Sequence, residues 1–436
     1  MWDSAGLTSP YIIDEPVRTV EDFYSRDAEI ATLLARIRRS TSTVVLAPPR
    51  MGATSLLNRL LQPDIQASLE EAVVGMEFID CADRIRYPID FYRRVAMALM
   101  ATQPDLGLDP LLEDERVLAD AVTFAIRHLD RRWVLLLDNF EALAEFPAHF
   151  FDHLRACAND GKPVLILTSR VPLDDLRLPT NGGSPFGNGI PVLRLGAWTD
   201  EDLAIFLSTS SRRSSVDLRP LCDEIVSLAG HVPAFVQHVA GACHEALNTG
   251  AMDVEALVPT LAESLRETFD QVWHSPSLRP AERDLLIALT YGNSPPLSNG
   301  MAAAAASLVR AGYLTSDGEI ASRLFTDYLR ATVPRVFVEP AARKVLIAGR
   351  VRSLPRRDFD LLLFLYSNAG MVCETDDILD NVWGLPLDRQ GPSDATMVYQ
   401  RIRALRQEVE ENPKKPRHIL NVPGTGYRFE NYSPLD

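Results

Sequence analysis

The sequence lacks several features that would define a class of protein at once. No run of about 18 consecutive apolar residues occurs, and the first residues do not combine a basic segment with an apolar one. The five cysteines are scattered along the chain and form no CxxC pair. GxSxG and HExxH motifs are also absent. We therefore expect a cytoplasmic protein with no membrane partner, no disulfide framework, no zinc site and no hydrolase triad.

Positive charge is also scarce. The chain has 44 lysines and arginines against 59 aspartates and glutamates, and its formal net charge is −15. A chain of this charge does not bind nucleic acid along its whole surface, so any DNA contact is expected in one module. At 436 residues and 46% apolar composition the chain is long enough for several cores, which predicts about two to four domains.

Apolar strand patterns alternate with amphipathic helix patterns in the first half of the chain. The segments STVVL, VVGMEFIDC, RWVLLLDNF and KPVLILTSR are typical of buried strands, and helical periods separate them. This alternation predicts an α/β domain with a parallel sheet covered by helices. Residues 178–192 are rich in Gly, Pro and Asn and predict a surface loop, after which the strand patterns fade and helical patterns continue.

The carboxy-terminal segment carries the most specific pattern. LPRRDFDLLLFL, DDILDNVWG and RIRALRQEVE predict helices, and GTGYRF predicts a closing hairpin. In this order they resemble the OmpR/PhoB-type winged helix-turn-helix over roughly a hundred residues. No aspartate-bearing receiver domain is evident before residue 335, so phosphorelay control is not expected.

The long helix at 394–410 is the expected recognition element. Its spacing places Val398, Ile402, Leu405 and Val409 on one buried face. The resemblance implies contact with double-stranded DNA, since Arg can donate to guanine and Gln to adenine in the major groove. The candidate DNA-binding residues are Gln400, Arg401, Arg403 and Arg406 on the helix, and Thr425, Tyr427 and Arg428 in the wing. The alternatives are solvated cations on an exposed helix, or a winged helix that docks a protein.

Residues 47–55, APPRMGATS, resemble a phosphate-binding loop between a strand and a helix. In such a loop, backbone amides and the helix amino terminus bind phosphates, a lysine reaches the terminal groups, and a hydroxyl binds Mg²⁺. Gly52, Thr54 and Ser55 fit that pattern, but Ala53 stands at the lysine position. Loss of that charge predicts weak or absent hydrolysis. Arg50 is a candidate for partial replacement of the charge.

Further fragments of residues 20–335 resemble the STAND branch of the AAA+-like P-loop ATPases. They are FYSRDAEIATLL, WVLLLDNFEAL, LILTSR and AGHVPAFV. The resemblance implies a site for ATP or ADP with Mg²⁺, in which Thr54 and Asp138 hold the metal. It places Arg26 and Pro233 near the base, and makes Asp138, Glu141 and Arg170 the catalytic candidates.

Asn139 weakens the case for catalysis, because active relatives usually carry a second carboxylate there and an amide cannot accept the proton of water. The alternatives are a strand-end cap for Asp138 and Asn139 and a surface salt bridge for Arg170. The predicted boundaries are an arm at 1–20, an α/β P-loop domain at 21–195, a helical lid at 196–270, a degenerate winged helix at 271–335 and the winged helix-turn-helix at 336–436.

Three functions remain open on the sequence. The favoured hypothesis is a DNA-binding regulator whose P-loop core, deficient in hydrolysis, controls or scaffolds the winged helix. The second is a pseudo-ATPase adaptor that recruits a protein partner or a second copy of itself, for instance in a bacterial defence system. The third is an active ATPase switch that uses Arg50 and Glu141 in place of the lost groups.

Overall fold

The computed structural model describes residues 10–182, 185–214, 216–250, 253–293, 299–333, 335–340, 342–386, 388 and 391–431. Residues 1–9 of the expected arm and residues 432–436 of the expected carboxy-terminal domain lie outside this description. The chain forms two compact units. One comprises residues up to Leu278 together with Leu308–Thr315, and the other comprises Arg279–Ser307 together with the residues from Ser316 on.

A parallel five-stranded sheet lies at the centre of the first unit, in the order β2-β3-β4-β1-β5. Its strands are β1 (Thr43–Leu46), β2 (Val73–Asp80), β3 (Arg132–Asp138), β4 (Val164–Ser169) and β5 (Val192–Arg194). The central strands β1, β3 and β4 are buried because helices cover both faces. The strand β5 corrects the sequence analysis, which ended the strands before it and assigned Val192 to a loop. It has only three residues, two of them exposed, and so lacks an apolar signal.

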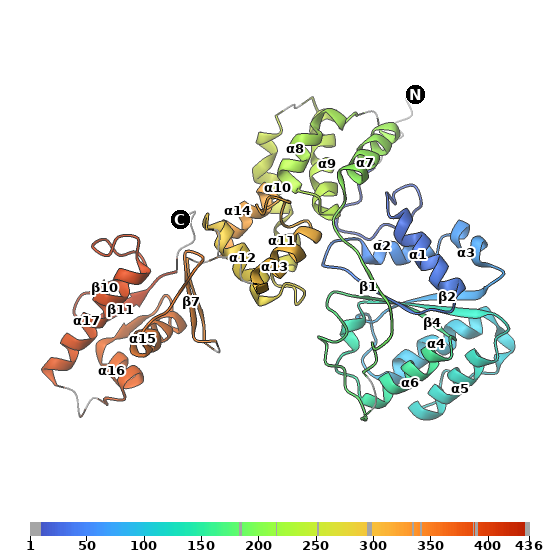
Figure 1. Ribbon diagram of the computed structural model, residues 1–436, viewed down its shortest axis with the longest axis horizontal. Coiled ribbons are helices and arrows are strands. Elements are labelled where there is room, and N and C mark those ends of the chain that lie inside the picture. Colours follow the sequence, from blue (N-terminus) through green and yellow to red (C-terminus); the bar gives the residue numbers. More distant parts are fainter. Residues whose placement is uncertain are drawn as a thin grey trace, which may run out of the picture. The chain divides into compact units, whose positions relative to one another are not determined.

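Helices lie on both faces of this sheet (Figure 1). One set is α1 (Asp27–Arg38), α2 (Ala53–Leu60) and α3 (Pro63–Leu69), and the other is α4 (Pro88–Thr102), α5 (Glu115–Arg127) and α6 (Ala148–Asn159). The second set packs on the sheet through an aromatic core that includes Phe91, Trp133 and Phe150, none of them more than 2% exposed. This core fixes the ends of β1, β3 and β4, where the candidate site lies.

The rest of the first unit is helical. It contains α7 (Asp200–Arg213), α8 (Cys222–Ala229), α9 (Pro233–Asn248), α10 (Val258–Ser264) and α11 (Arg266–Trp273). Helix α7 begins after Thr199, whose hydroxyl caps it by accepting a hydrogen bond from the backbone amide of Asp202 at 3.1 Å. Phe235 of α9 and Phe269 of α11 meet edge to face, with ring centroids 4.9 Å apart.

Residues 10–18, which we call the strap, connect this helical part with the P-loop helix. Tyr11 is buried and packs edge-on against Phe206 of α7, with ring centroids 5.8 Å apart. Further along, the Val17 amide donates a hydrogen bond to the Ser55 hydroxyl at 3.0 Å. The side-chain amide of Asn58 in turn donates to the Val17 carbonyl at 3.0 Å. The strap is therefore attached at both of its ends.

The second unit contains helices and two three-stranded antiparallel sheets, in the orders β6-β7-β8 and β10-β11-β9. The helices are α12 (Pro280–Thr290), α13 (Asn299–Arg310, of which the residues from Leu308 on belong to the first unit), α14 (Arg323–Thr332), α15 (Arg356–Ser367), α16 (Thr375–Trp383) and α17 (Pro392–Val409). The strands are β6 (Val336–Glu339), β7 (Lys344–Ile347), β8 (Arg350–Arg352), β9 (Val372–Glu374), β10 (Ile419–Val422) and β11 (Gly426–Phe429).

The sheet β6-β7-β8 packs on α12. Gly349, in the turn between β7 and β8, has a φ of +69°, and a Cβ there would lie 2.5 Å from the Cα of Ala288. Glycine is required at this contact because the backbones approach too closely for a side chain. Lys344 also pairs with Asp284, and the Arg350 guanidinium donates to the Asn293 side chain at 2.7 Å.

The core of the carboxy-terminal domain confirms the predicted helix face. Val398, Ile402, Leu405 and Val409 of α17 are all at most 1% exposed. They pack with side chains from α15, α16 and β11 in one cluster. Strand β9 was not among the elements expected from the sequence, and it is paired with β11. No helix in the described part of the chain is long and apolar enough to cross a membrane.

Candidate nucleotide and nucleic-acid sites

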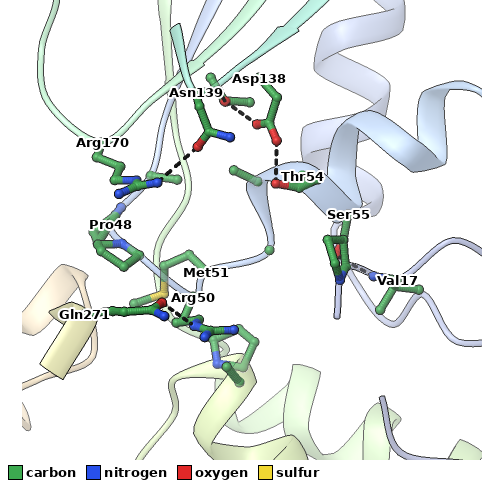
Figure 2. A pocket seen from close by; sticks show the side chains of 18 of the residues that line it. Val17, Pro48, Arg50, Met51, Thr54, Ser55, Asp138, Asn139, Arg170 and Gln271 are labelled. Atoms are coloured by element: carbon green, nitrogen blue, oxygen red, sulfur yellow. Dashed lines mark hydrogen bonds between the residues drawn. The ribbon is translucent and has the colours of Figure 1, made fainter. Parts of the chain in front are cut away.

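The P-loop segment joins β1 to α2, and Gly52 caps the helix. Its φ of +83° is a left-handed conformation that favours glycine, so the turn into α2 explains this residue. The Thr54 hydroxyl donates to Oδ2 of Asp138 at 2.7 Å, and the Thr168 hydroxyl donates to Oδ1 at 2.5 Å (Figure 2). Asp138 is only 2% exposed. The fold thus brings together the two residues that the sequence analysis proposed as magnesium ligands.

The side chains beyond Asp138 form a second small network. The Asn139 amide donates to Asp80 at 3.0 Å and its oxygen accepts from the Arg170 guanidinium at 3.1 Å (Figure 2). Arg170 also lies 3.2 Å from the carboxylate of Glu141. Burial is the main cause that raises the pKa of Glu141, and the Arg170 charge opposes this effect. Asn139, Arg170 and Glu141 are therefore close enough to act together.

Two further arginines of the predicted site have partners elsewhere in the first unit. Arg26 donates to the Gly196 carbonyl at 2.7 Å and pairs with Glu29 at 3.1 Å. Arg50 donates to the side-chain oxygen of Gln271 at 3.0 Å, and its guanidinium points away from the Thr54–Asp138 pair (Figure 2). In this conformation neither guanidinium occupies the place of the missing lysine.

A cavity of about 760 Å³ opens beside these residues. The P-loop, the ends of β3 and β4, the strap and the start of α9 line it, including all the predicted nucleotide residues. Gln237 of α9 also lines it; this residue is 7% exposed, and its Oε1 has no hydrogen-bond partner among the described residues. Sequence reasoning missed Gln237, because a single glutamine on an apolar helix carries no recognisable signal.

The residues present fit a nucleotide in part. The amino terminus of α2 with Gly52, Thr54 and Ser55 offers amides and hydroxyls for phosphate, and Thr54 with Asp138 offers oxygen ligands for Mg²⁺. The lysine charge is absent, since Ala53 occupies that position. Within the described residues, no cluster of three or more His, Cys, Asp and Glu side chains forms a metal site.

The predicted DNA-binding residues of α17 fall into two groups. Gln400 and Arg403 are exposed, and their side chains make no hydrogen bond or ion pair within the described residues. Arg401 is exposed and pairs with the buried carboxylate of Asp358 at 3.4 Å. Arg406 is half-buried, and its guanidinium donates twice to the Ile419 carbonyl, at 2.9 and 2.6 Å. Arg406 thus attaches α17 to β10.

The wing shows a similar division. Thr425 is exposed at the β10–β11 turn, whereas Tyr427 is 7% exposed and belongs to the domain core. Arg428 pairs with Glu430 at 2.6 Å. Tyr399 was not among the predicted residues, although it is 56% exposed and lies one helical turn before Arg403. An exposed aromatic residue next to unpaired polar residues is the signal that could have added Tyr399 to the candidate DNA-binding residues.

The fold and the two sites define a two-part protein, with a P-loop ATPase-like first unit and a winged helix domain of the response-regulator type. Residues 349–429 match the family described as "Transcriptional regulatory protein, C terminal", so this segment is a domain of that family. The first part is similar to the Walker-type ATPase of Pyrococcus abyssi. The TM-score is 0.51 at 18% identity, over 72% of this chain and 98% of that one, and this likeness shows the fold.

Curated relatives match the carboxy-terminal part. The sensory transduction protein RegX3 of Mycolicibacterium smegmatis is 36% identical over 86 residues, which are 20% of this chain and 36% of that protein. The DNA-binding response regulator MtrA of Mycolicibacterium paratuberculosis is 32% identical over 120 residues, 28% of this chain and 48% of that protein. The chain thus spans less than half the length of these relatives.

Proposed function

We propose that this protein is a DNA-binding regulator in which a nucleotide-binding, hydrolysis-deficient core controls or scaffolds the winged helix. The observation that carries the proposal is the exposed polar surface of α17, where Gln400 and Arg403 project from a helix whose other face is buried. This helix lies in a domain of the transcriptional-regulator family. MtrA, a relative of this domain, is by its name a DNA-binding protein.

The contact groups have separate roles in this proposal. Gln400 and Arg403 read base edges or bind phosphate, because they are exposed and uncommitted among the described residues. Thr425 contacts the backbone from the wing. Arg401 remains within reach of DNA while Asp358 orients it. Arg406 and Tyr427 instead maintain the domain that presents the others.

The nucleotide part of the proposal rests on the cavity beside α2. The amides of the P-loop bind phosphate, Thr54 and Asp138 hold Mg²⁺ when a nucleotide is bound, and Gln237 accepts a hydrogen bond from an amino group of the base. Bound Mg²⁺ would neutralise phosphate charge. Turnover is expected to be very slow, because Ala53 supplies no charge and Glu141 is paired with Arg170. A cytoplasmic location follows from the need to reach DNA.

The proposal is tested by fluorescence anisotropy of the full chain with mixed-sequence duplex DNA across a salt series. Wild-type protein should bind with an affinity that falls steeply with salt. A Gln400→Ala/Arg403→Ala variant should bind more weakly, whereas Arg116→Ala, which removes one exposed charge from α5, should bind like wild type. Absent duplex binding would reject the DNA-binding function and favour the adaptor that docks a protein. Equal binding by all three proteins would instead reject Gln400 and Arg403 as the DNA contacts.

A further inference from the structure

Arg50 is the only arginine or lysine within the P-loop segment 47–55, and it lies where three parts of the first unit meet. Its Nε donates to Gln271 of α11 at 3.0 Å, and one of its terminal nitrogens lies 3.7 Å from the carboxylate of Asp14 in the strap. Its φ is left-handed, at +67°, and its guanidinium points away from the Thr54–Asp138 pair (Figure 2). The one cationic side chain of the P-loop segment therefore already has partners within the chain.

Asp14 also contacts the helical part of the unit. Its other carboxylate oxygen lies 3.5 Å from Nε2 of His238 on α9, a histidine whose Nδ1 donates to the Ala234 carbonyl at 3.0 Å. One turn further along α9, the strap residue Ile13 covers Gly241, where a Cβ would lie 3.0 Å from the Ile13 side chain. The strap therefore follows α9 before it crosses to α2.

The crossing occurs at the cavity. Ile12, Asp14, Glu15, Pro16 and Val17 all line it, together with the P-loop. At the far end of the strap, the hydroxyl of Ser55, one of the predicted nucleotide residues, accepts the hydrogen bond of the Val17 amide. The strap thus uses two groups of the P-loop segment, the Arg50 guanidinium and the Ser55 hydroxyl.

We propose that the strap is an internal competitor for the nucleotide site, in which the Asp14 carboxylate occupies Arg50 in place of a ligand phosphate. When a nucleoside phosphate binds, Arg50 exchanges Asp14 for phosphate oxygens and the strap loosens from the P-loop helix. Guanidinium binds carboxylate and phosphate by the same geometry, so the exchange replaces one charge-assisted contact with another. This inference rests on the nucleotide binding proposed above and adds the regulation of that site.

The expected change in ADP affinity follows from the exposure of the Asp14–Arg50 ion pair. Asp14 is 55% exposed and Arg50 22% exposed at the side chain, and the atoms are 3.7 Å apart, so solvent screens the interaction. Removing the Asp14 charge should tighten the binding of ADP about two- to fivefold, the range expected for a partly exposed ion pair. Removing Arg50 should weaken ADP binding and abolish this gain.

The experiment uses the full chain and ADP with magnesium. Calorimetric titration compares wild type with Asp14→Asn, Arg50→Ala and the double variant. Glu15→Gln is the matched control, because it removes the same charge from an exposed neighbour in the strap for which no ion pair is recorded. Hydrogen exchange of the strap, read at the Val17 amide region, is measured with and without ADP. This second readout is independent of affinity.

Support requires that Asp14→Asn binds ADP more tightly than Glu15→Gln, that the gain vanishes without Arg50, and that ADP increases exchange in the strap. If wild type binds ADP and Asp14→Asn matches Glu15→Gln, or if ADP decreases exchange in the strap, the competition is refuted while nucleotide binding stands. If no variant binds ADP, both the competition and the nucleotide part of the proposed function are refuted.

Discussion

Two arginines of α17, one turn apart by sequence, should respond differently to substitution. Arg403 is exposed with no recorded partner in the described structure, whereas the Arg406 guanidinium makes both of its hydrogen bonds to the Ile419 carbonyl. Arg403→Ala should therefore affect DNA affinity, and Arg406→Ala should affect the stability of the carboxy-terminal domain. The sequence pattern alone treats the two residues as equivalent.

These contacts set the expected losses of DNA affinity and of domain stability. Loss of a guanidinium that binds a base edge costs about 1 to 3 kcal/mol, or roughly 5- to 150-fold in Kd. If Arg403 binds phosphate instead, its loss should make the negative slope of log affinity against log salt shallower by about 0.9. Arg406→Ala removes a charged donor from one buried carbonyl, which should lower the free energy of unfolding of the domain by about 1.5 to 3 kcal/mol.

The assay combines two measurements on each full-length variant. Anisotropy titration gives the affinity of the folded fraction for duplex DNA, and hydrogen exchange over residues 398–429 gives local stability. We expect weaker binding with unchanged exchange for Arg403→Ala, and faster exchange around β10 for Arg406→Ala. The reasoning is refuted if Arg403→Ala binds like wild type while Arg406→Ala loses DNA without any change in exchange.

Three further substitutions test other parts of the structure. Thr54→Val should abolish the magnesium dependence of ADP binding, measured by titration with and without EDTA. An unchanged dependence would exclude Thr54 as a magnesium ligand. Gln237→Leu should weaken ADP by about 0.5 to 1.5 kcal/mol while leaving pyrophosphate binding unchanged, because only the base contact is lost; equal losses for both would refute that contact. Gly349→Ala should lower the melting temperature of the second unit more than Gly384→Ala. Both positions have positive φ, but only Gly349 faces backbone at 2.5 Å, so equal effects would contradict the packing argument.

Much of the fold was predictable because the central strands and their helices carry strong periodic patterns. The runs at β3 and β4 are apolar without interruption, as expected for strands covered on both faces. The strands that were missed, β5 and β9, have three residues each, and their pairing depends on neighbours distant in sequence. Such short edge strands have no pattern of their own to detect.

The candidate sites were predictable only as residue lists. The family resemblance pointed to Thr54 and Asp138, and the fold brings them to 2.7 Å. Spacing could not indicate that Arg50 is engaged by Gln271, which lies 221 positions away in the chain. It also could not separate Arg403 from Arg406, since the partner of Arg406 is a backbone carbonyl whose position depends on how β10 packs.

If the core controls the winged helix as proposed, the nucleotide site and the DNA site are coupled, and the coupling can be measured from either site. If bound ADP changes the affinity for DNA by some factor, bound DNA must change the affinity for ADP by the same factor, because the two equilibria form one thermodynamic cycle. A core that controls the winged helix therefore gives a factor different from one in both titrations. A core that only scaffolds it gives a factor of one in both, even if each ligand binds tightly. Titrating ADP into the chain with and without saturating duplex decides between these two forms of the proposed function. Repeating the titration with Asp14→Asn shows whether the strap contributes to the coupling.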